Sequence, residues 1–453
     1  MEVSMTRISF LAGALLLIMG TALLPLGGAH AAAGTQPVPA EYFGLHIARI
    51  AQTQPWYPYG DRITPWPTTK FGSWRLVDAY VGWPLLEPQR GKWNFTALDK
   101  YVDLAQKTGT NLVMNLGFTP TWASARPSEP SNYLPGNAAE PRNIEDWRNY
   151  VRTVALRYKG RIKYYELWNE VNVPGFYTGS KEKLVELAAA AYQILKQVDP
   201  GIIFISPSVT GASGEHAWLD DYFAKGGAQY VDVVSYHFYV PKSPPEAMLP
   251  VIQQIQGIMR KYGLDNKPLW NTEIGWWIDN KTTSKRGGGV DKNWIMLDDE
   301  HASAYLARTF LLSWPAGVSR VYWYSWDSLD MGLVRPGSLK LAPAAIAYDK
   351  VARSLTGGLL KQCTRDATNL WTCQLARADG KAVWIVWTGD DVARSWVVPA
   401  DWNIESAEML DGTSFKVNGN AIRIGMAPIF LVSRNSGGNM AMSRNNLASP
   451  LKH

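Results

Sequence analysis

The stretch Tyr164-Tyr165-Glu166-Leu167-Trp168-Asn169-Glu170 decides how the rest of this chain is interpreted. It has the aromatic and aliphatic composition of a buried strand, and it ends abruptly in an amide and a carboxylate. A parallel strand that ends in this way places polar groups at the carboxyl-terminal face of an α/β barrel. We therefore predict that Glu170 lies at the mouth of such a barrel.

A second stretch of the same kind follows further along the chain. Pro268-Leu269-Trp270-Asn271-Thr272-Glu273 again runs from apolar residues into a terminal carboxylate. Either Glu taken alone could equally be a structural group. Two carboxylates at the ends of two strands, in a chain with 21 Trp and 21 Tyr, suggest cleavage of glycosidic bonds, in which one group is the acid and the other the base or nucleophile.

Strands and helices alternate around these two stretches. We expect strands at 42–46, 72–76, 112–117, 164–170, 202–206, 231–239, 268–273 and 321–327, and helices at 96–108, 145–158, 181–198, 216–225, 245–262, 300–314 and 343–355. Eight such units predict an α/β fold, a (β/α)8 TIM barrel over residues 40–355. A doubly wound open sheet is the alternative, but the sequence lacks the Gly-x-Gly-x-x-Gly turn that usually follows its first strand.

The pattern changes beyond residue 356. Short apolar segments are separated by turns at Asp379-Gly380, Asp411-Gly412 and Asn418-Gly419. This predicts a smaller antiparallel β-sandwich domain over residues 356–434, packed on the barrel. Residues 435–453 are polar and rich in Asn and Ser, and we expect a disordered tail.

The N-terminal segment has the pattern of an export signal. Arg7 precedes the apolar run Ile8–Leu26, and Ala29-His30-Ala31 offers a small-residue cleavage site, so residues 1–32 are expected to be a signal peptide. An uncleaved anchor in the inner membrane is the alternative. Either way the folded part is expected to be periplasmic or extracellular. There Cys363 and Cys373 could form a disulfide, with two free buried thiols as the alternative.

The net charge of the chain and the spacing of its Cys and His residues indicate which partners and metals to expect. The formal net charge is +6 and the pI is near 9.0, but the basic residues are scattered without a run or stripe, so we expect no nucleic-acid partner. No cluster of Cys and His has the spacing of a zinc site. We expect a monomer that needs no metal.

Four motifs together carry a family resemblance: Trp168-Asn169-Glu170, Asn271-Thr272-Glu273, Ser235–Tyr239, and Trp74-Arg75 followed by Glu87–Phe95. In their order along the chain and their positions at successive strand ends, they resemble the retaining glycoside hydrolases of clan A. The chain is most similar to glycoside hydrolase family 39, which contains β-xylosidases, iduronidases and bacterial exopolysaccharide hydrolases. The resemblance covers residues 40–350, and it implies hydrolysis of O-glycosidic bonds without a cofactor.

The resemblance also assigns roles. Glu170 matches the general acid/base on the fourth strand, and Glu273 matches the nucleophile on the seventh. Asn169 would hydrogen-bond the 2-hydroxyl of the sugar. Arg75 would lie under the nucleophile and keep it ionised, as a nearby cation does.

Further sugar contacts are implied by the resemblance or by position at strand ends. They are His46, Asn115, Trp122, His237, Tyr239, Trp276 and Trp323. For His237 and the tryptophans, packing in the core is the competing interpretation. Glu166 shares a strand face with Glu170 but lies deeper, so we expect it to be structural. The sequence departs from the family at Val171, where the family commonly has Pro, and the loop there is expected to differ in shape.

Export and aromatic-rich loops favour a polymeric substrate. The loops Pro55–Pro67 and Trp276–Trp294 could wall an extended cleft, so the hypothesis is an enzyme that cleaves an exopolysaccharide internally. One alternative is an exo-acting enzyme related to β-xylosidases, which would have a blind pocket in place of an open groove. The other is a non-catalytic polysaccharide-binding protein, since a fold alone does not secure a function.

Overall fold

The structure is a computed structural model that describes residues 36–51, 63–280, 294–419 and 421–436. The predicted signal segment lies outside these residues, as do nearly all of the predicted tail and the greater parts of the loops 55–67 and 276–294. Among the described residues, no helix has the length and apolar character needed to cross a membrane.

A barrel of parallel strands occupies the larger part of the described chain. Its order is β5 (Ile203–Ile205), β4 (Tyr164–Leu167), β3 (Asn111–Leu116), β2 (Ser73–Arg75), β1 (Phe43–His46), β10 (Val318–Trp323), β7 (Leu269–Ile274) and β6 (Val234–Tyr236). A parallel bridge between Ile205 and Val233 links the two ends of this sheet. The predicted (β/α)8 barrel is therefore confirmed, and the doubly wound alternative is wrong.

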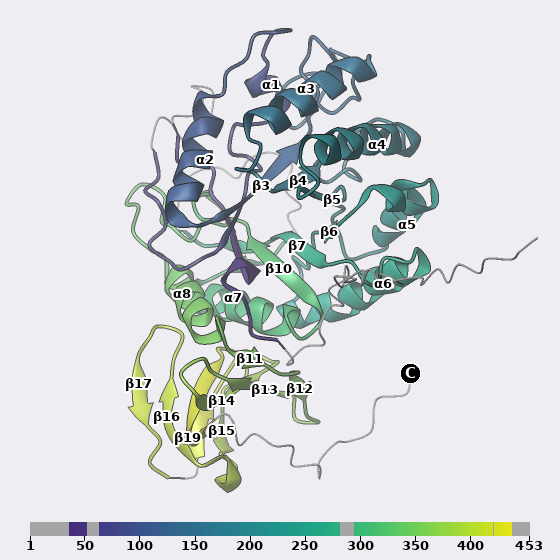
Figure 1. Ribbon diagram of the computed structural model, residues 1–453. Helices are drawn as coiled ribbons and strands as arrows, with labels where there is room; N and C mark the ends of the chain where they lie inside the picture. Colours follow the sequence, from purple (N-terminus) through teal and green to yellow (C-terminus); the bar gives the residue numbers. More distant parts are fainter. Residues whose placement is uncertain (1–35, 52–62, 281–293, 420, 437–453) are drawn as a thin grey trace, which may run out of the picture.

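Helices surround the barrel (Figure 1). They are α1 (Trp83–Leu86), α2 (Thr96–Thr108), α3 (Ile144–Arg157), α4 (Lys181–Val198), α5 (His216–Ala224), α6 (Met248–Lys261), α7 (Asp299–Ser313) and α8 (Pro343–Leu355). In α6 the buried Met248, Val251, Ile252 and Ile255 recur at the spacing of one helical face, which explains why this segment packs as a helix. Short elements complete the barrel: η1 (Ala40–Tyr42), η2 (Gly227–Tyr230), η3 (Pro245–Ala247), β8 (Trp277–Ile278) and β9 (Met296–Leu297).

Some strands end earlier than expected, where side chains or loops take the backbone hydrogen bonds that a neighbouring strand would otherwise form. The expected strand 231–239 is confined to β6, because the His237 amide donates to the Val209 carbonyl and the Phe238 amide to the Asn271 side chain. The expected strand 164–170 ends at Leu167, so Glu170 lies on the loop beyond β4.

Strands β1 and β10 pack closely at Gly44. A Cβ on Gly44 would lie 2.4 Å from the Tyr322 ring, so only glycine fits at this position of β1.

The C-terminal part is an antiparallel β-domain. Its larger sheet contains β11 (Leu359–Leu360), β12 (Thr364–Arg365), β13 (Leu370–Ala376), β14 (Lys381–Thr388), β16 (Ile404–Glu408), β17 (Ser414–Lys416) and β19 (Ile429–Ser436). Only β15 (Arg394–Val397) and β18 (Ala421–Ile424) form the second sheet, and η4 (Ala400–Trp402) follows β15. Val386, Ile422 and Leu431 share the core of this domain. Cys363 and Cys373 form a disulfide.

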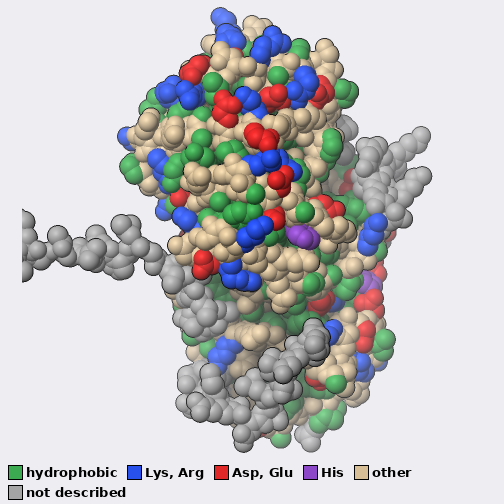
Figure 2. Space-filling view, turned by 90° about the vertical axis from the view of Figure 1, so that its right-hand side faces the viewer, with side chains coloured by type: hydrophobic (Ala, Val, Ile, Leu, Met, Phe, Trp, Pro, Cys, Tyr) green, Lys and Arg blue, Asp and Glu red, His purple; other side chains and the backbone are tan. Residues whose placement is uncertain are grey.

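The β-domain packs beside α7 and α8 (Figure 1), and a hydrogen bond from Trp387 of this domain reaches a buried ion pair of the barrel. Glu246 in η3 accepts hydrogen bonds from Arg308 Nε in α7 at 2.8 Å and from Trp387 Nε1 in β14 at 2.9 Å. The Arg308 side chain is almost fully buried. Elsewhere the surface is mixed: on the face in Figure 2, basic and acidic side chains are interspersed.

Glu246→Ala should lower the free energy of unfolding by about 3 kcal/mol, because it leaves the buried Arg308 charge without its carboxylate. Urea denaturation followed by tryptophan fluorescence measures the effect. Glu186→Ala is the matched control, since its partner Lys183 and the Glu186 side chain are both partly exposed, and its effect should stay within about 0.5 kcal/mol. Equal destabilisation by the two variants would contradict the assignment.

Candidate active site

Arg75, at the end of β2, is the centre of the polar group inside the barrel mouth. Its guanidinium is fully buried and donates in three directions: Nε to Glu166 Oε2 at 2.6 Å, Nη1 to Glu273 Oε2 at 2.9 Å, and Nη2 to Asn169 Oδ1 at 2.8 Å. A planar guanidinium fixes the angles between its donors. Arg75 therefore sets the positions of side chains from β4, β7 and the loop beyond β4 relative to one another.

Glu166 lies in the fully buried floor of the site. Besides Arg75, it accepts hydrogen bonds from Ser235 Oγ at 2.8 Å and from Asn115 Nδ2 at 3.2 Å. The Ser235 hydroxyl also lies 2.5 Å from the Thr272 hydroxyl. Arg75 is the charged partner of the Glu166 carboxylate, so the part of Glu166 is to hold Arg75 in place.

Glu170 is delivered by a strained loop. Trp168 and Glu170 have φ angles of 55° and 43°, a region that costs a non-glycine residue of the order of 1–3 kcal/mol. Hydrogen bonds hold this backbone: Asn115 Nδ2 donates to the Trp168 carbonyl at 2.7 Å, and the Glu170 amide donates to Ser208 Oγ at 3.0 Å. The strain thus turns the Glu170 side chain toward the barrel axis in a fixed direction.

Glu170 and Glu273 face each other across the mouth. One oxygen of each carboxyl group and a ring nitrogen of His237 all lie within 4.8 Å of one another. His237 Nδ1 is 3.0 Å from Glu170 Oε1, and the Tyr239 hydroxyl donates to Glu273 Oε1 at 3.1 Å. Carboxyl groups separated by about 5 Å suit a double displacement, whereas single displacement requires a wider gap.

The environments of the two carboxyl groups differ. Burial raises the pKa of Glu170 to about 7, although Thr210 and the Arg75 charge oppose this. Burial and the Glu170 charge raise the pKa of Glu273, whereas Arg75 and the Tyr239 hydroxyl lower it. Because Arg75 contacts Glu273 directly, we place the negative charge on Glu273 and the remaining proton on Glu170.

The two histidines add no positive charge. Burial, followed by the charge of Arg75, lowers the pKa of both His46 and His237 well below the usual histidine range. His46 Nε2 lies 2.9 Å from the Thr272 carbonyl, which can only accept, so this nitrogen carries the proton. Glu170, His237 and Glu273 are close enough to hold a cation, but the Arg75 guanidinium already contacts Glu273 and would repel one.

The predicted tryptophan contacts lie elsewhere. Trp276 and Trp323 have no exposed surface, and their rings stack with centroids 6.0 Å apart in the core. Trp122 donates from Nε1 to the Glu87 carbonyl and has the Arg90 guanidinium over its ring. The structure thus gathers Arg75, Asn115, Asn169, His46, His237 and Tyr239 around the carboxyl pair, whereas these three tryptophans pack against other protein groups.

Asp78 and two tyrosines belong to the site although the sequence analysis missed them. Asp78 accepts hydrogen bonds from the Tyr133 hydroxyl at 2.5 Å and from the Tyr324 hydroxyl at 2.7 Å. The Asp78 charge raises the pKa of Glu273. Asp78 follows the exit of the second strand, which is a usable signal. Tyr133 lies in an irregular loop, where no pattern points to it.

Comparisons with known proteins agree with this geometry. Residues 83–276, which include both carboxyl groups, match the family model described as "Glycosyl hydrolases family 39". A β-xylosidase from Geobacillus stearothermophilus is 27% identical over 207 residues, which is 40% of each chain. An endo-1,4-β-xylanase B from Humicola insolens is 25% identical over 185 residues, 39% of this chain and 48% of that one. The chain thus spans less than half the length of either relative.

Solved structures share the fold. A family 39 glycoside hydrolase from the gut symbiont Bacteroides cellulosilyticus WH2 has a TM-score of 0.63 and 21% identity, covering 81% of this chain and 76% of that one. A family 39 β-xylosidase from Caulobacter crescentus has a TM-score of 0.60 and 17% identity, covering 89% and 98%. At these identities the likeness establishes a common fold.

Burial should keep the pKa of Glu170 above the ordinary carboxyl range, and Glu273→Gln should lower this pKa by removing a neighbouring negative charge. Difference infrared spectroscopy, with Glu170→Gln identifying the band, measures this titration. Tyr239→Phe is the control, because it removes a hydrogen bond to Glu273 and leaves the charge. An unchanged Glu170 band in Glu273→Gln would show that the two groups do not interact.

Proposed function

We propose that this protein, whose barrel belongs to glycoside hydrolase family 39, is a retaining glycosidase in which Glu170 is the acid/base and Glu273 the nucleophile. The observation that carries the proposal is the buried carboxyl pair within 4.8 Å, with only Glu273 in direct contact with Arg75. Such a pair supplies one proton donor and one nucleophile at the same pH.

In the first step the Glu273 carboxylate attacks the anomeric carbon while Glu170 gives its proton to the departing glycosidic oxygen. The bond to the leaving group breaks as a glycosyl ester of Glu273 forms. The Arg75 contact on Oε2 and the Tyr239 contact on Oε1 keep the attacking group ionised and oriented. Asn169 Oδ1 is held by Arg75, which leaves its Nδ2 to donate to the sugar 2-hydroxyl.

In the second step Glu170 acts as the base. Esterification of Glu273 removes the neighbouring negative charge, so the pKa of Glu170 falls and its carboxylate is favoured. The carboxylate takes a proton from water, which attacks the anomeric carbon and releases Glu273. Two inversions give net retention. The neutral His237 beside Glu170 lets this group change charge without a competing ion pair.

Glu170→Gln and Glu273→Gln should each reduce kcat/KM for a shared substrate by about a thousandfold or more, because each removes a group that acts in the transition state. A panel of aryl β-glycosides and envelope polysaccharides provides the substrates. NMR of the first product formed by the wild type should show retention of the anomer.

Glu186→Ala, on the outer surface of α4, is the control and should retain wild-type rates. Inversion in the wild type, or normal rates in both Gln variants, would disprove the mechanism. Binding of a polysaccharide without cleavage of any substrate by the wild type would favour the non-catalytic alternative.

For the substrate, we propose an exported polysaccharide that is cleaved internally, in keeping with the predicted signal segment. An endo-xylanase is among the relatives, which supports internal cleavage. The β-xylosidases among the relatives favour the second candidate, an exo-acting enzyme on a small glycan. Chain lengths in the same digests distinguish the two: internal cleavage yields oligosaccharides early, whereas exo action releases single sugars from chain ends.

We also propose that the chain is exported and cut after Ala31 or Ala32. The Cys363–Cys373 disulfide supports this location, because such bonds persist in oxidising compartments. Mass spectrometry of the protein purified from its native envelope should find a mature N-terminus at residue 32 or 33. A peptide that begins within residues 1–8 would instead support a retained membrane anchor.

A further inference from the structure

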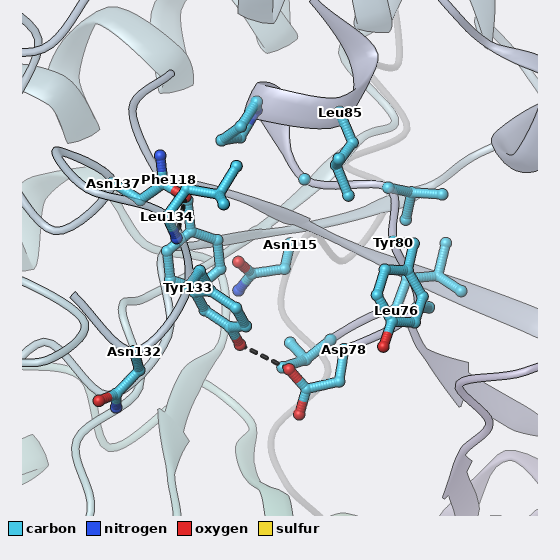
Figure 3. A pocket seen from close by; sticks show the side chains of 15 residues that line it. Leu76, Asp78, Tyr80, Leu85, Asn115, Phe118, Asn132, Tyr133, Leu134 and Asn137 are labelled. Carbon is cyan, nitrogen blue, oxygen red and sulfur yellow. Dashed lines mark hydrogen bonds between the residues drawn. The ribbon is translucent and has the colours of Figure 1, made fainter. Parts of the chain in front are cut away.

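A cavity of about 400 Å3, lined in part by Asp78 and Asn115, has no part in the mechanism above. It lies between the segment 76–85, which follows β2, and the loop that carries Phe118 and residues 132–137 (Figure 3). Most of its wall is apolar, with Leu76, Val81, Leu85, Phe118 and Leu134 among the lining residues. Its volume is in the range of ligand pockets.

One buried polar atom faces this cavity without a partner. Asn115 Nδ2 donates to Glu166 and to the Trp168 carbonyl, both of which can only accept. The amide orientation is therefore fixed, and Oδ1 points the other way. Oδ1 accepts no hydrogen bond within the described chain, although Asn115 is only 3% exposed. In Figure 3 this amide lies between Phe118 and Tyr133 on one side and Leu76 and Tyr80 on the other.

The cavity is connected to the carboxyl pair by charge and by its lining. Asp78 and Tyr133 both line it, and their hydrogen bond is drawn in Figure 3. The charge of Asp78 raises the pKa of the Glu273 carboxyl group, so Asp78 is within electrostatic range of that group. Asn115 contacts the Glu166 side chain that holds Arg75. Asn115 thus links the lining of the cavity, through Glu166 and Arg75, to the side chain of Glu273.

We propose that this cavity is a specificity pocket for a sugar substituent that combines a methyl group with a hydrogen-bond donor, the donor meeting Asn115 Oδ1 and the methyl group packing on the apolar wall. A 6-deoxyhexose and an N-acetylated amino sugar both offer this chemistry. The proposal rests on the proposed function, because it takes the sugar to be bound at Glu170 and Glu273. A donor is needed, since burying Oδ1 unpaired is costly.

Equilibrium binding of methyl glycosides, followed by ligand-observed NMR with the full chain, tests the pocket. One pair of probes is methyl 6-deoxy-β-D-glucoside and methyl β-D-xyloside, which differ by one methyl group. The other pair is methyl N-acetyl-β-D-glucosaminide and methyl β-D-glucoside. In at least one pair, the probe with the additional methyl group (the 6-deoxyglucoside or the N-acetylglucosaminide) should bind about fourfold more tightly than its partner. This factor corresponds to the burial of one methyl group.

Gly82→Leu should abolish this preference by filling the cavity. Gly82 lines the cavity with φ −67°, and a Cβ there would meet Phe118 and Pro84 at 3.6 and 3.7 Å, which are ordinary contacts. Leu134→Trp, from the half-exposed rim, narrows the cavity by a second route if Gly82→Leu fails to fold. Gly257→Leu is the matched control, because Gly257 lies on α6 and has only the tip of Arg260 near its Cβ position; it should keep the preference.

Equal binding of the two probes within both pairs would overturn the proposal. A binding preference that persists in Gly82→Leu or Leu134→Trp would also overturn it, and so would a preference that the control Gly257→Leu removes. Binding does not require hydrolysis, so this result is independent of the anomer experiment. A preference in the 6-deoxy pair alone identifies a deoxysugar, and one in the N-acetyl pair alone identifies an amino sugar.

Discussion

The fork of hydrogen bonds from Arg75 is the interaction on which the site depends. One buried guanidinium binds Glu166, Asn169 and Glu273, which come from two strands and a loop. A buried charge must be compensated, and here two carboxylates share that task. Because of the direct contact with Arg75, the proposed mechanism takes Glu273 as the ionised member of the carboxyl pair and Glu170, which lacks this contact, as the protonated one.

The strained loop beyond β4 complements this fork. Two successive polar contacts, from Asn115 and Ser208, hold Trp168 and Glu170 in backbone conformations that these residues seldom adopt. Asn115 therefore stabilises the loop through Nδ2 while its Oδ1 faces the neighbouring cavity. The same side chain thus links the position of Glu170, the proposed proton donor, to the pocket where substrate selection is proposed.

The β-domain contacts the barrel through several side chains: Trp387 donates to Glu246, and Glu408 pairs with Lys350. Glu246 contacts both Arg308 and Trp387, so one carboxylate serves the buried arginine of the barrel and a tryptophan of the β-domain. The active-site groups come from the barrel strands and the loops after them. The β-domain thus stabilises one side of the barrel, and the described site is built without it.

The sequence by itself determined the order of strands and helices, because hydrophobic periodicity and strand-end polar residues are local signals. It also indicated Glu170 and Glu273, since each stands at the end of an apolar run, and the family resemblance of the motifs added Arg75, Asn169, His237 and Tyr239. Only the tertiary structure decided that Trp276 and Trp323 are buried against each other and that Asp78 and Tyr133 join the site. Those outcomes depend on which loops meet above the barrel and on which faces of the aromatic rings are covered. Contacts between residues that are distant in the chain produce no periodic pattern in the sequence.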